Sequence, residues 1–205
     1  MSILGYLDII MGIFKKILSA LYDLRMGISR TTGLGMTILS SKRMIDSPSS
    51  FYTLKGESNT GIPISFENFA GKKVLIVNLA SRCGFTPQYK ELQSLQDQFR
   101  DKLIILGCPS NDFGGQEPGT DEEIATFCEV NFRTTFPLLK KASVKGDEKQ
   151  LVYAWLTNPS LNGWNNHEPS WNFCKYLVNE RGQLVNFYSS SVSPLSELVI
   201  KSIAS

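Results

Sequence analysis

The feature that most constrains the fold is an almost unbroken apolar run at Val74–Ala80, which reads VLIVNLA. Apolar and β-branched residues on both faces of such a run indicate a strand that is covered on both sides, as in parallel sheets. A second run, Leu103–Gly107, has the same character. Between them, Tyr89–Phe99 repeats apolar residues at helical spacing, so the pattern predicts a strand–helix–strand unit with a right-handed crossover.

Later segments extend this unit to a three-layer α/β domain. Thr120 and Glu123 form a capping-box pattern before a helix that is predicted to reach about Val130. Two strand patterns, Phe173–Val178 and Leu184–Tyr188, flank a turn and predict a hairpin. The other predicted elements are a short strand at Phe51–Leu54, a Thr86 cap with Pro87 at the first position of the 89–99 helix, a helix at Gln150–Leu156 and a final helix from Pro194 to about Ile203.

The first fifty residues differ in character from the rest of the 205-residue chain. Residues 1–26 are mostly apolar, and their polar residues fall on one narrow helical face, which predicts an amphipathic helix. Charges interrupt the run too often for a membrane span, and no charge precedes it as in a secretory signal. We expect this helix to contact a membrane surface; the alternatives are packing on a partner or on its own domain, or a poorly ordered extension. Residues 27–50, rich in Gly, Ser and Thr, predict a linker to a globular domain at 51–205.

Composition excludes several classes of function. With 21 Lys and Arg against 19 Asp and Glu, a net charge of +2 argues against nucleic acid as the main partner. Four cysteines in a chain of this length exclude a disulfide-stapled mini-fold, and His167 as the only histidine excludes a His-rich metal site. Unpaired thiols fit a reducing compartment, although an exported redox enzyme would look similar. We therefore expect a cytoplasmic protein that residues 1–26 attach to a membrane surface.

Cys83 is the cysteine whose position suggests chemistry. It follows the predicted strand at Val74–Ala80 and precedes a helix, so its sulfur is expected at the carboxyl edge of a parallel sheet, where ligands bind. The positive end of the helix dipole favours thiolate over thiol, and Arg82 adds to this effect. The sequence therefore offers Cys83 as a nucleophile, with a buried structural thiol as the alternative.

Two further segments supply hydrogen-bond donors for that edge. The loop with Gln116 follows the second predicted strand and opens at the same edge, so its amide is a candidate neighbour of Cys83. Trp171 and Asn172 open the predicted hairpin, and their indole and amide N–H groups would stabilise a thiolate without lending it a proton. The alternatives are a solvent-facing loop amide for Gln116 and a core position for Trp171.

Three ordered motifs resemble the glutathione peroxidase family. Val77–Thr86 (VNLASRCGFT) resembles the segment around its reactive residue, and Leu106–Pro118 (LGCPSNDFGGQEP) resembles its second signature. Trp171–Phe173 resembles the third, and the resemblance extends from about Phe51 to Ser202. It implies a thioredoxin-like fold with a central mixed sheet in three layers, to which this chain adds the N-terminal amphipathic helix.

The resemblance also implies a reaction. Members of the family reduce hydrogen peroxide or organic and lipid hydroperoxides at a cysteine or selenocysteine. By matching position, Cys83 is the peroxidatic residue, and Gln116, Trp171 and Asn172 complete a catalytic tetrad. The thiolate attacks the O–O bond and becomes a sulfenic acid, while the three partners donate hydrogen bonds to the sulfur and the leaving oxygen. No metal or organic cofactor is expected.

Cys128 resembles the resolving cysteine of the thioredoxin-dependent branch of the family. In that role it condenses with the oxidised Cys83 to an internal disulfide, which a thioredoxin-like partner reduces by exchange. An apolar helix position is the alternative for Cys128, and glutathione is the alternative reductant. Two other functions remain open: a peroxide sensor that passes its oxidation to a partner, and, if Cys83 is unreactive, a membrane-tethered structural domain.

The chain departs from the family pattern in three places. The second motif reads Cys108–Ser110, so the family cysteine at position 110 is absent, and the new thiol at 108 is expected to face the core without a role. The segment between Leu156 and Trp171 is short, which resembles the monomeric members and predicts a monomer. No arginines match those that hold glutathione in selenium-containing members. Cys174 and His167 are expected to have no part in the chemistry.

Overall fold

A computed structural model describes residues 17, 20–21, 24, 35–42 and 45–205. Most of the helix predicted at 1–26, and much of the linker predicted at 27–50, lie outside the described residues. Ile17, Ala20, Leu21 and Leu24, which are described, are helical. Across the described part of the chain, no helix combines the length and the apolar character that crossing a bilayer requires.

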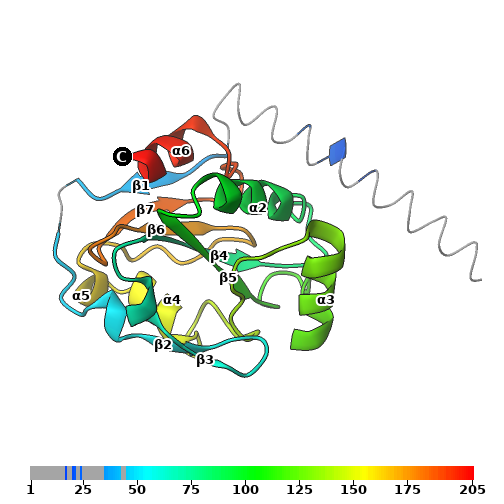
Figure 1. Ribbon diagram of the computed structural model, residues 1–205, viewed down its shortest axis with the longest axis horizontal. Helices are drawn as coiled ribbons and strands as arrows, with labels where there is room; N and C mark the ends of the chain where they lie inside the picture. The colour runs from blue at the N-terminus through cyan, green and yellow to red at the C-terminus, as the bar shows by residue number, and fades with distance from the viewer. Residues whose placement is uncertain (1–16, 18–19, 22–23, 25–34, 43–44) are drawn as a thin grey trace, which may run out of the picture.

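A five-stranded mixed sheet forms the centre of the molecule (Figure 1). In spatial order its strands are β1 (Ile38–Ser40), β7 (Leu184–Tyr188), β6 (Lys175–Val178), β4 (Lys73–Leu79) and β5 (Leu103–Pro109). β4 and β5 are parallel, whereas β6 pairs antiparallel with both β4 and β7. The parallel pair and the hairpin predicted from the sequence are therefore present, and β4 and β5 end at the same edge of the sheet.

Helices and 3-10 turns cover both faces of this sheet. They are η1 (Phe51–Thr53), η2 (Phe66–Phe69), α2 (Gln88–Gln98), α3 (Asp121–Phe132), α4 (Leu151–Leu156), α5 (Pro159–Asn162) and α6 (Glu197–Ala204). A separate two-stranded sheet consists of β2 (Lys55–Glu57) and β3 (Pro63–Ser65). Figure 1 shows α2 and α6 on one side of the central sheet, and α4, α5 and the β2–β3 hairpin on the other.

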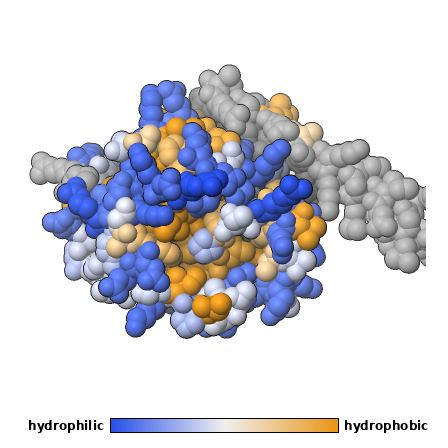
Figure 2. Space-filling view, in the orientation of Figure 1, coloured by the Kyte–Doolittle hydropathy of each residue, from blue (hydrophilic) through white to orange (hydrophobic). Residues whose placement is uncertain are grey.

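Alternate side chains of β4 belong to two separate hydrophobic cores, one on each face of the sheet. Leu75, Val77 and Leu79 belong to a cluster with residues of α2, α3 and α6, whereas Val74 and Ile76 belong to a cluster with residues of η1, η2 and α4. All five side chains are fully buried, which explains why the run shows no polar alternation. The space-filling view of one face shows apolar residues grouped toward its middle with hydrophilic residues around them (Figure 2). The predicted three-layer α/β arrangement is confirmed.

The predicted linker contains a strand. β1 pairs antiparallel with β7, with Ile38 opposite Tyr188 and Ser40 opposite Asn186. The domain therefore begins earlier than predicted, and the assignment of 27–50 to a linker is wrong for this part of it. A strand of three residues carries too little alternation to stand out among the surrounding Gly, Ser and Thr.

Two other boundaries differ from the prediction. Phe51–Leu54, expected as a strand, contains the 3-10 helix η1, whose first turn is capped by the Ser50 side chain. α6 begins at Glu197 and not at Pro194, because the Ser196 hydroxyl accepts a backbone hydrogen bond and caps the helix there. In both cases a serine cap sets where the helix begins: Ser50 caps η1, where the apolar pattern predicted a strand, and Ser196 caps α6, where Pro194 predicted the first residue.

Gly107 of β5 allows the segment after α3 to lie against the sheet. The Gly107 N–H donates to the Pro137 carbonyl at 2.9 Å, and the Leu139 N–H donates to the Gly107 carbonyl at 2.8 Å. A β-carbon added at Gly107 would lie 2.5 Å from Leu138 Cδ2 and 2.6 Å from Leu79 Cδ1. This close approach is the physical reason for a glycine inside a buried strand.

We predict that Gly107→Ala lowers the free energy of unfolding by about 1–3 kcal/mol, the usual cost of overpacking a core site. Urea denaturation followed by circular dichroism measures this change. Gly84→Ala is the matched control, because nothing lies within 4 Å of a β-carbon added there. Equal stability of the two variants would contradict the close approach at Gly107.

Candidate active site

Cys83 lies in a tight loop between β4 and α2. Its N–H donates to Thr86 Oγ1 at 3.0 Å, and the Thr86 hydroxyl donates to the Ala80 carbonyl at 2.9 Å. The Phe85 N–H donates to the Cys83 sulfur, with 3.4 Å between nitrogen and sulfur. The Cys83 side chain is buried. The loop thus holds the sulfur near the carboxyl end of β4, as predicted, with a backbone donor aimed at it.

The predicted capping role of Thr86 is wrong. Its hydroxyl is used within the Cys83 loop, and Pro87 holds the N-cap position of α2 without a side-chain hydrogen bond. The chain enters α2 through successive tight turns, in which the Gln88 N–H donates to the Phe85 carbonyl at 2.9 Å. A threonine before a helix can bond to several nearby backbone groups, and here the loop supplies the better partners.

The loop after β5 brings Gln116 to the Cys83 loop. The Arg82 N–H donates to the Gln116 carbonyl at 3.0 Å, and the Ser81 hydroxyl donates to Glu117 Oε2 at 3.0 Å. The two glycines ahead of Gln116 have φ values of 65° and 63°, a left-handed backbone that lets the chain turn back toward β4. Two separate hydrogen bonds therefore fix this loop to the loop that carries the thiol.

Asn172 and Trp171 reach the same edge from the turn before β6. The Asn172 amide donates to Gln116 Oε1 at 2.9 Å, so two of the predicted site residues are in direct contact. Because Oε1 is the acceptor, the NH2 group of Gln116 is oriented to donate elsewhere. Trp171 is 39% exposed, and its ring centroid lies 5.8 Å from that of Phe113, which places the indole on the solvent side of the site.

Asn78 is the residue that sequence reasoning missed. It is fully buried in β4; its NH2 group donates to the Trp171 carbonyl at 2.9 Å, and its Oδ1 accepts from the Cys174 N–H at 2.9 Å. Its own carbonyl accepts from the Phe173 N–H at 2.7 Å. Phe173 has φ of 66°, a strained backbone for a non-glycine residue that persists only where its surroundings hold it. Asn78 therefore clamps this turn to β4, and its polarity inside an apolar run was the available signal.

A buried carboxylate supports the Gln116 loop. Burial raises the pKa of the Glu117 carboxyl, while hydrogen bonds with Ser81 and the positive charges of Lys141 and Arg82 act in the opposite direction. The Glu117 N–H donates to Asn111 Oδ1 at 2.9 Å. These contacts hold Glu117, the residue after Gln116, and so help to fix the position of the Gln116 side-chain amide.

Cys128 lies on α3 and belongs to the same core cluster as Cys83. Burial raises the pKa of its thiol to about 11, and the Tyr89 hydroxyl lies beside it. All four cysteines are in the described part of the chain, and none of them forms a disulfide. The structure therefore places Cys128 in the core that it shares with Cys83, as a thiol that stays protonated at neutral pH.

α3 packs on the domain through one face and is less buried than the central strands. Its capping box is complete, because Thr120 Oγ1 accepts from the Glu123 N–H and the Glu123 side chain accepts from the Thr120 N–H. Of its 12 residues, Ile124 and Cys128 are buried. Phe127 and Phe132 are partly buried against Tyr89. Its C-cap, Arg133, has φ of 52°, again left-handed in a non-glycine residue. α3 is therefore less firmly held than β4, whose side chains are all buried.

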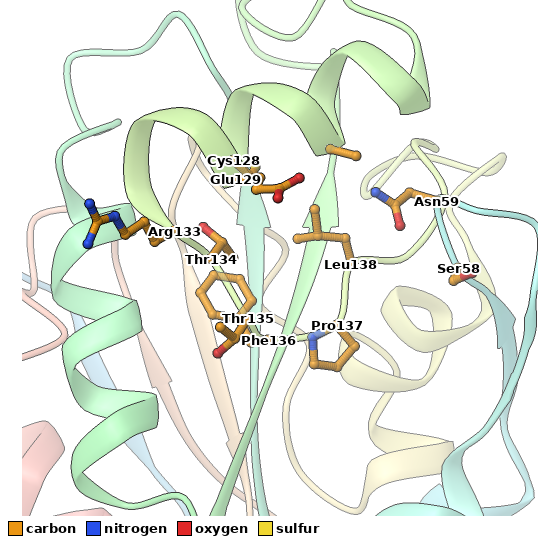
Figure 3. Close-up of a pocket in the computed structure, with 11 residues that line it drawn as sticks. Ser58, Asn59, Cys128, Glu129, Arg133, Thr134, Thr135, Phe136, Pro137 and Leu138 are labelled. Atoms are coloured by element: carbon orange, nitrogen blue, oxygen red, sulfur yellow. The ribbon is translucent and has the colours of Figure 1, made fainter.

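A pocket of about 540 Å³ runs along α3 (Figure 3). Cys128 and Glu129 belong to the helix on one side, the segment 134–138 lies opposite, and Ser58 and Asn59 lie at one end. This pocket, called the α3 pocket below, leaves one side of the helix without a packing neighbour. It therefore exposes the turn that carries Cys128 to an approaching molecule, although the thiol itself is buried.

Cys108, Cys174 and His167 form hydrogen bonds with residues outside the predicted catalytic tetrad. Cys108 is fully buried, as predicted, and burial raises the pKa of its thiol. The Cys174 sulfur lies 3.6 Å from Ser190 Oγ and 3.9 Å from Ser170 Oγ. His167 is exposed in the loop before β6. Within the described ranges, no group of three or more His, Cys, Asp or Glu is placed to bind a metal ion.

The sequence model of the glutathione peroxidase family matches residues 51–157. The chain belongs to the glutathione peroxidase family. It is 48% identical over 147 residues to the glutathione peroxidase-like peroxiredoxin gpx1 of Schizosaccharomyces pombe, a match that covers 71% of this chain and 92% of that protein. The family membership predicted from the three motifs is therefore confirmed.

Solved structures show the same fold. The structure described as Trgpx in apo form has a TM-score of 0.58 and 31% sequence identity, and the match covers 77% of this chain and 97% of that chain. A thioredoxin family thiol:disulfide interchange protein from Chlorobium tepidum has a TM-score of 0.54 at 15% identity, covering 80% of this chain and 100% of that one. The predicted thioredoxin-like fold is confirmed.

We predict that Asn78→Ala lowers the free energy of unfolding by about 2–4 kcal/mol, because it leaves two backbone groups of the Trp171 turn buried without their partner. Urea denaturation followed by circular dichroism measures the loss in the free energy of unfolding. The matched control is Asn131→Ala, an exposed asparagine whose amide donates to the Phe127 carbonyl on α3. Equal unfolding free energies for the two variants would show that the clamp contributes nothing.

Proposed function

We propose that this chain is a cysteine-dependent peroxidase that reduces hydrogen peroxide or organic hydroperoxides at Cys83. The observation that carries the proposal is the contact between the Asn172 amide and Gln116 Oε1, in a loop tied to the Cys83 loop by the Arg82–Gln116 hydrogen bond. Two amide side chains from distant parts of the chain thereby meet at a loop that is hydrogen-bonded to the loop of the buried thiol. Membership of the glutathione peroxidase family supports the same activity and favours an enzyme over the sensor alternative.

The first step is a displacement at oxygen. The Cys83 thiolate attacks the outer peroxide oxygen, an S–O bond forms as the O–O bond breaks, and the leaving oxygen takes a proton to become an alcohol or water. Cys83 is oxidised to the sulfenic acid, and the hydroperoxide is reduced. Gln116, Asn172 and the Trp171 indole stabilise the charge on sulfur and on the leaving oxygen with neutral donors. The Phe85 N–H and the start of α2 favour the thiolate before attack.

The second step forms a disulfide with Cys128. Its thiol loses a proton and attacks the Cys83 sulfur, so that an S–S bond forms and the sulfenic oxygen leaves as water. In the intact helix this step is disfavoured, because Cys128 is buried and its pKa is raised to about 11. We therefore propose that α3 opens locally to deliver the thiol, as its few buried side chains and strained end allow.

The last step returns both cysteines to thiols. A dithiol protein of the thioredoxin type reduces the disulfide by exchange, with glutathione as the alternative reductant. The α3 pocket offers such a protein a concave surface beside the opened helix. The relative from Schizosaccharomyces pombe is named a peroxiredoxin, which agrees with a peroxidase that regenerates its cysteine through thiol exchange.

The chemistry is tested by two substitutions in full-length protein. Cys83→Ser should abolish hydroperoxide reduction, since a hydroxyl is a far poorer nucleophile at neutral pH. Gln116→Ala should lower the single-turnover rate by about 10²–10³, the usual cost of removing one such donor. Gln98→Ala, an exposed glutamine near the end of α2, is the matched control and should react like wild type. Near wild-type activity in Cys83→Ser would refute the proposed function.

The resolving step has its own test. Peroxide should convert reduced protein to a Cys83–Cys128 disulfide, which peptide mapping under non-reducing conditions detects. Cys128→Ser should consume a single equivalent of peroxide and then fail to turn over with thioredoxin, while Cys174→Ser serves as the matched control. Unimpaired thioredoxin-linked turnover of Cys128→Ser would assign the resolving role to Cys108, Cys174 or external glutathione.

We also propose that residues 1–26 attach the enzyme to a membrane surface. Ile17, Leu21 and Leu24 are spaced to share one helical face, and their side chains are 51%, 56% and 61% exposed. Replacing these three residues by serine should sharply reduce co-sedimentation of the full chain with phosphatidylcholine–phosphatidylserine vesicles. Ile62→Ser, which changes an equally exposed residue between β2 and β3, is the control. If wild type also stays in the supernatant, the apolar face instead contacts protein.

A further inference from the structure

A small recess of about 160 Å³ opens beside the Cys83 loop. It is lined by Gly35, Phe85, Ser170, Trp171, Ser189, Ser190 and Ser191. Phe85 also supplies the N–H that donates to the Cys83 sulfur, and Trp171 is a proposed partner of that sulfur, so two residues of the recess belong to the surroundings of the Cys83 loop. Sites for drug-sized ligands usually measure about 300–1,000 Å³, so this recess fits only a small group.

Gly35 lines one side of the recess and begins the segment 35–40, which is called the N-terminal wall below. The Ser191 hydroxyl donates to the Gly35 carbonyl, and the Thr37 N–H donates to Ser189 Oγ at 2.8 Å. The Ser189 N–H donates in turn to the Thr37 carbonyl at 2.9 Å, which continues the β1–β7 pairing toward the recess. These hydrogen bonds connect the N-terminal wall to residues 189–191, which line the opposite side of the recess.

Apolar side chains of the N-terminal wall also pack against the hydrophobic core. Met36 and Ile38 lie against the core cluster that contains Cys83 and Phe85. The family model begins only at Phe51, so the wall precedes the part of the chain that the family model matches. The wall is therefore a feature of this chain's own N-terminal segment that reaches the edge of the site.

We propose that the N-terminal wall limits the size of the hydroperoxide that reacts at Cys83, favouring hydrogen peroxide and small polar hydroperoxides over bulky apolar ones. This rests on the peroxidase function proposed above. The O–O bond must lie close to the sulfur and in line with it. In this proposal the group attached to the peroxide extends past Phe85 and Trp171 into the recess that both residues line. The wall and Trp171 keep that recess small, and its serine hydroxyls disfavour a large apolar group.

The test measures a ratio of rates in the full chain. Reduced protein is mixed with hydrogen peroxide or with cumene hydroperoxide, and single-turnover rate constants are determined by stopped flow. The double variant Thr37→Pro/Ser191→Ala removes the N–H and the hydroxyl that hold the wall. We expect the ratio of the cumene to the hydrogen peroxide rate constant to rise about tenfold, the lower end of what one methylene group decides in a pocket.

Two further variants sharpen the comparison. Ser40→Ala is the matched control, because it removes the 2.7 Å bond from the Asn186 amide to Ser40 Oγ in the same strand pair but at a residue that does not line the recess. Its ratio should stay at the wild-type value. Ser170→Leu adds bulk at the exposed rim of the recess and should lower the ratio.

Hydrogen exchange at the Ser189 amide shows whether the double variant has detached the wall. An unchanged ratio despite faster exchange overturns the proposal. If hydrogen exchange at Ser189 is unchanged as well, the double variant has left the wall attached. The Ser170→Leu variant then decides, and an unchanged ratio of rate constants in that variant overturns the proposal. Persistence of the single-turnover reaction in Cys83→Ser would refute the peroxidase function itself, whereas unchanged ratios in a reaction that requires Cys83 refute only the role of the wall.

Discussion

The parallel pairing of β4 with β5 is the constraint on which the site depends. In this register Leu79 lies opposite Pro109, so the two strands end together and their loops leave from one edge of the sheet. The Ser110 N–H donates to the Leu79 carbonyl at 3.1 Å and extends the pairing to the point where the chains diverge. Because β4 is buried on both faces, a slip by one residue would exchange side chains between two filled cores. The register therefore fixes the positions from which the loops carrying Cys83 and Gln116 begin.

From this edge the molecule combines a rigid part with a loosely held one. The Cys83 loop, the Gln116 loop and the turn at Trp171 are joined by hydrogen bonds, and the amide of Asn78 holds that turn from inside β4. Such preorganisation suits a reaction in which charge moves along one S–O–O line. A disulfide instead needs two Cα atoms within about 7 Å of each other. α3 differs from the loops, since only two of its side chains are buried and burial raises the pKa of the Cys128 thiol to about 11.

Local signals in the sequence were sufficient for most of the fold. The apolar run at Val74–Ala80 indicated a strand buried on both faces, and Thr120 marked the start of α3, because both depend on neighbours close in sequence. The turn between β6 and β7 was equally local. Three motifs were enough to identify the family and to nominate Gln116 and Asn172, which the structure brings into contact.

The sequence by itself determined the order of the main strands and helices, the family and the residues that meet at the sheet edge, because short-range periodicity and motifs record them. Only the tertiary structure decided the roles of Asn78 and Thr86 and the pairing of β1. Asn78 bonds to Trp171 across 93 residues, and Thr37 bonds to Ser189 across 152. No local pattern records such partners, because they become neighbours only when the sheet has brought distant segments together. The same holds for the recess beside the Cys83 loop, which brings Gly35 together with Phe85 and with residues 170–191.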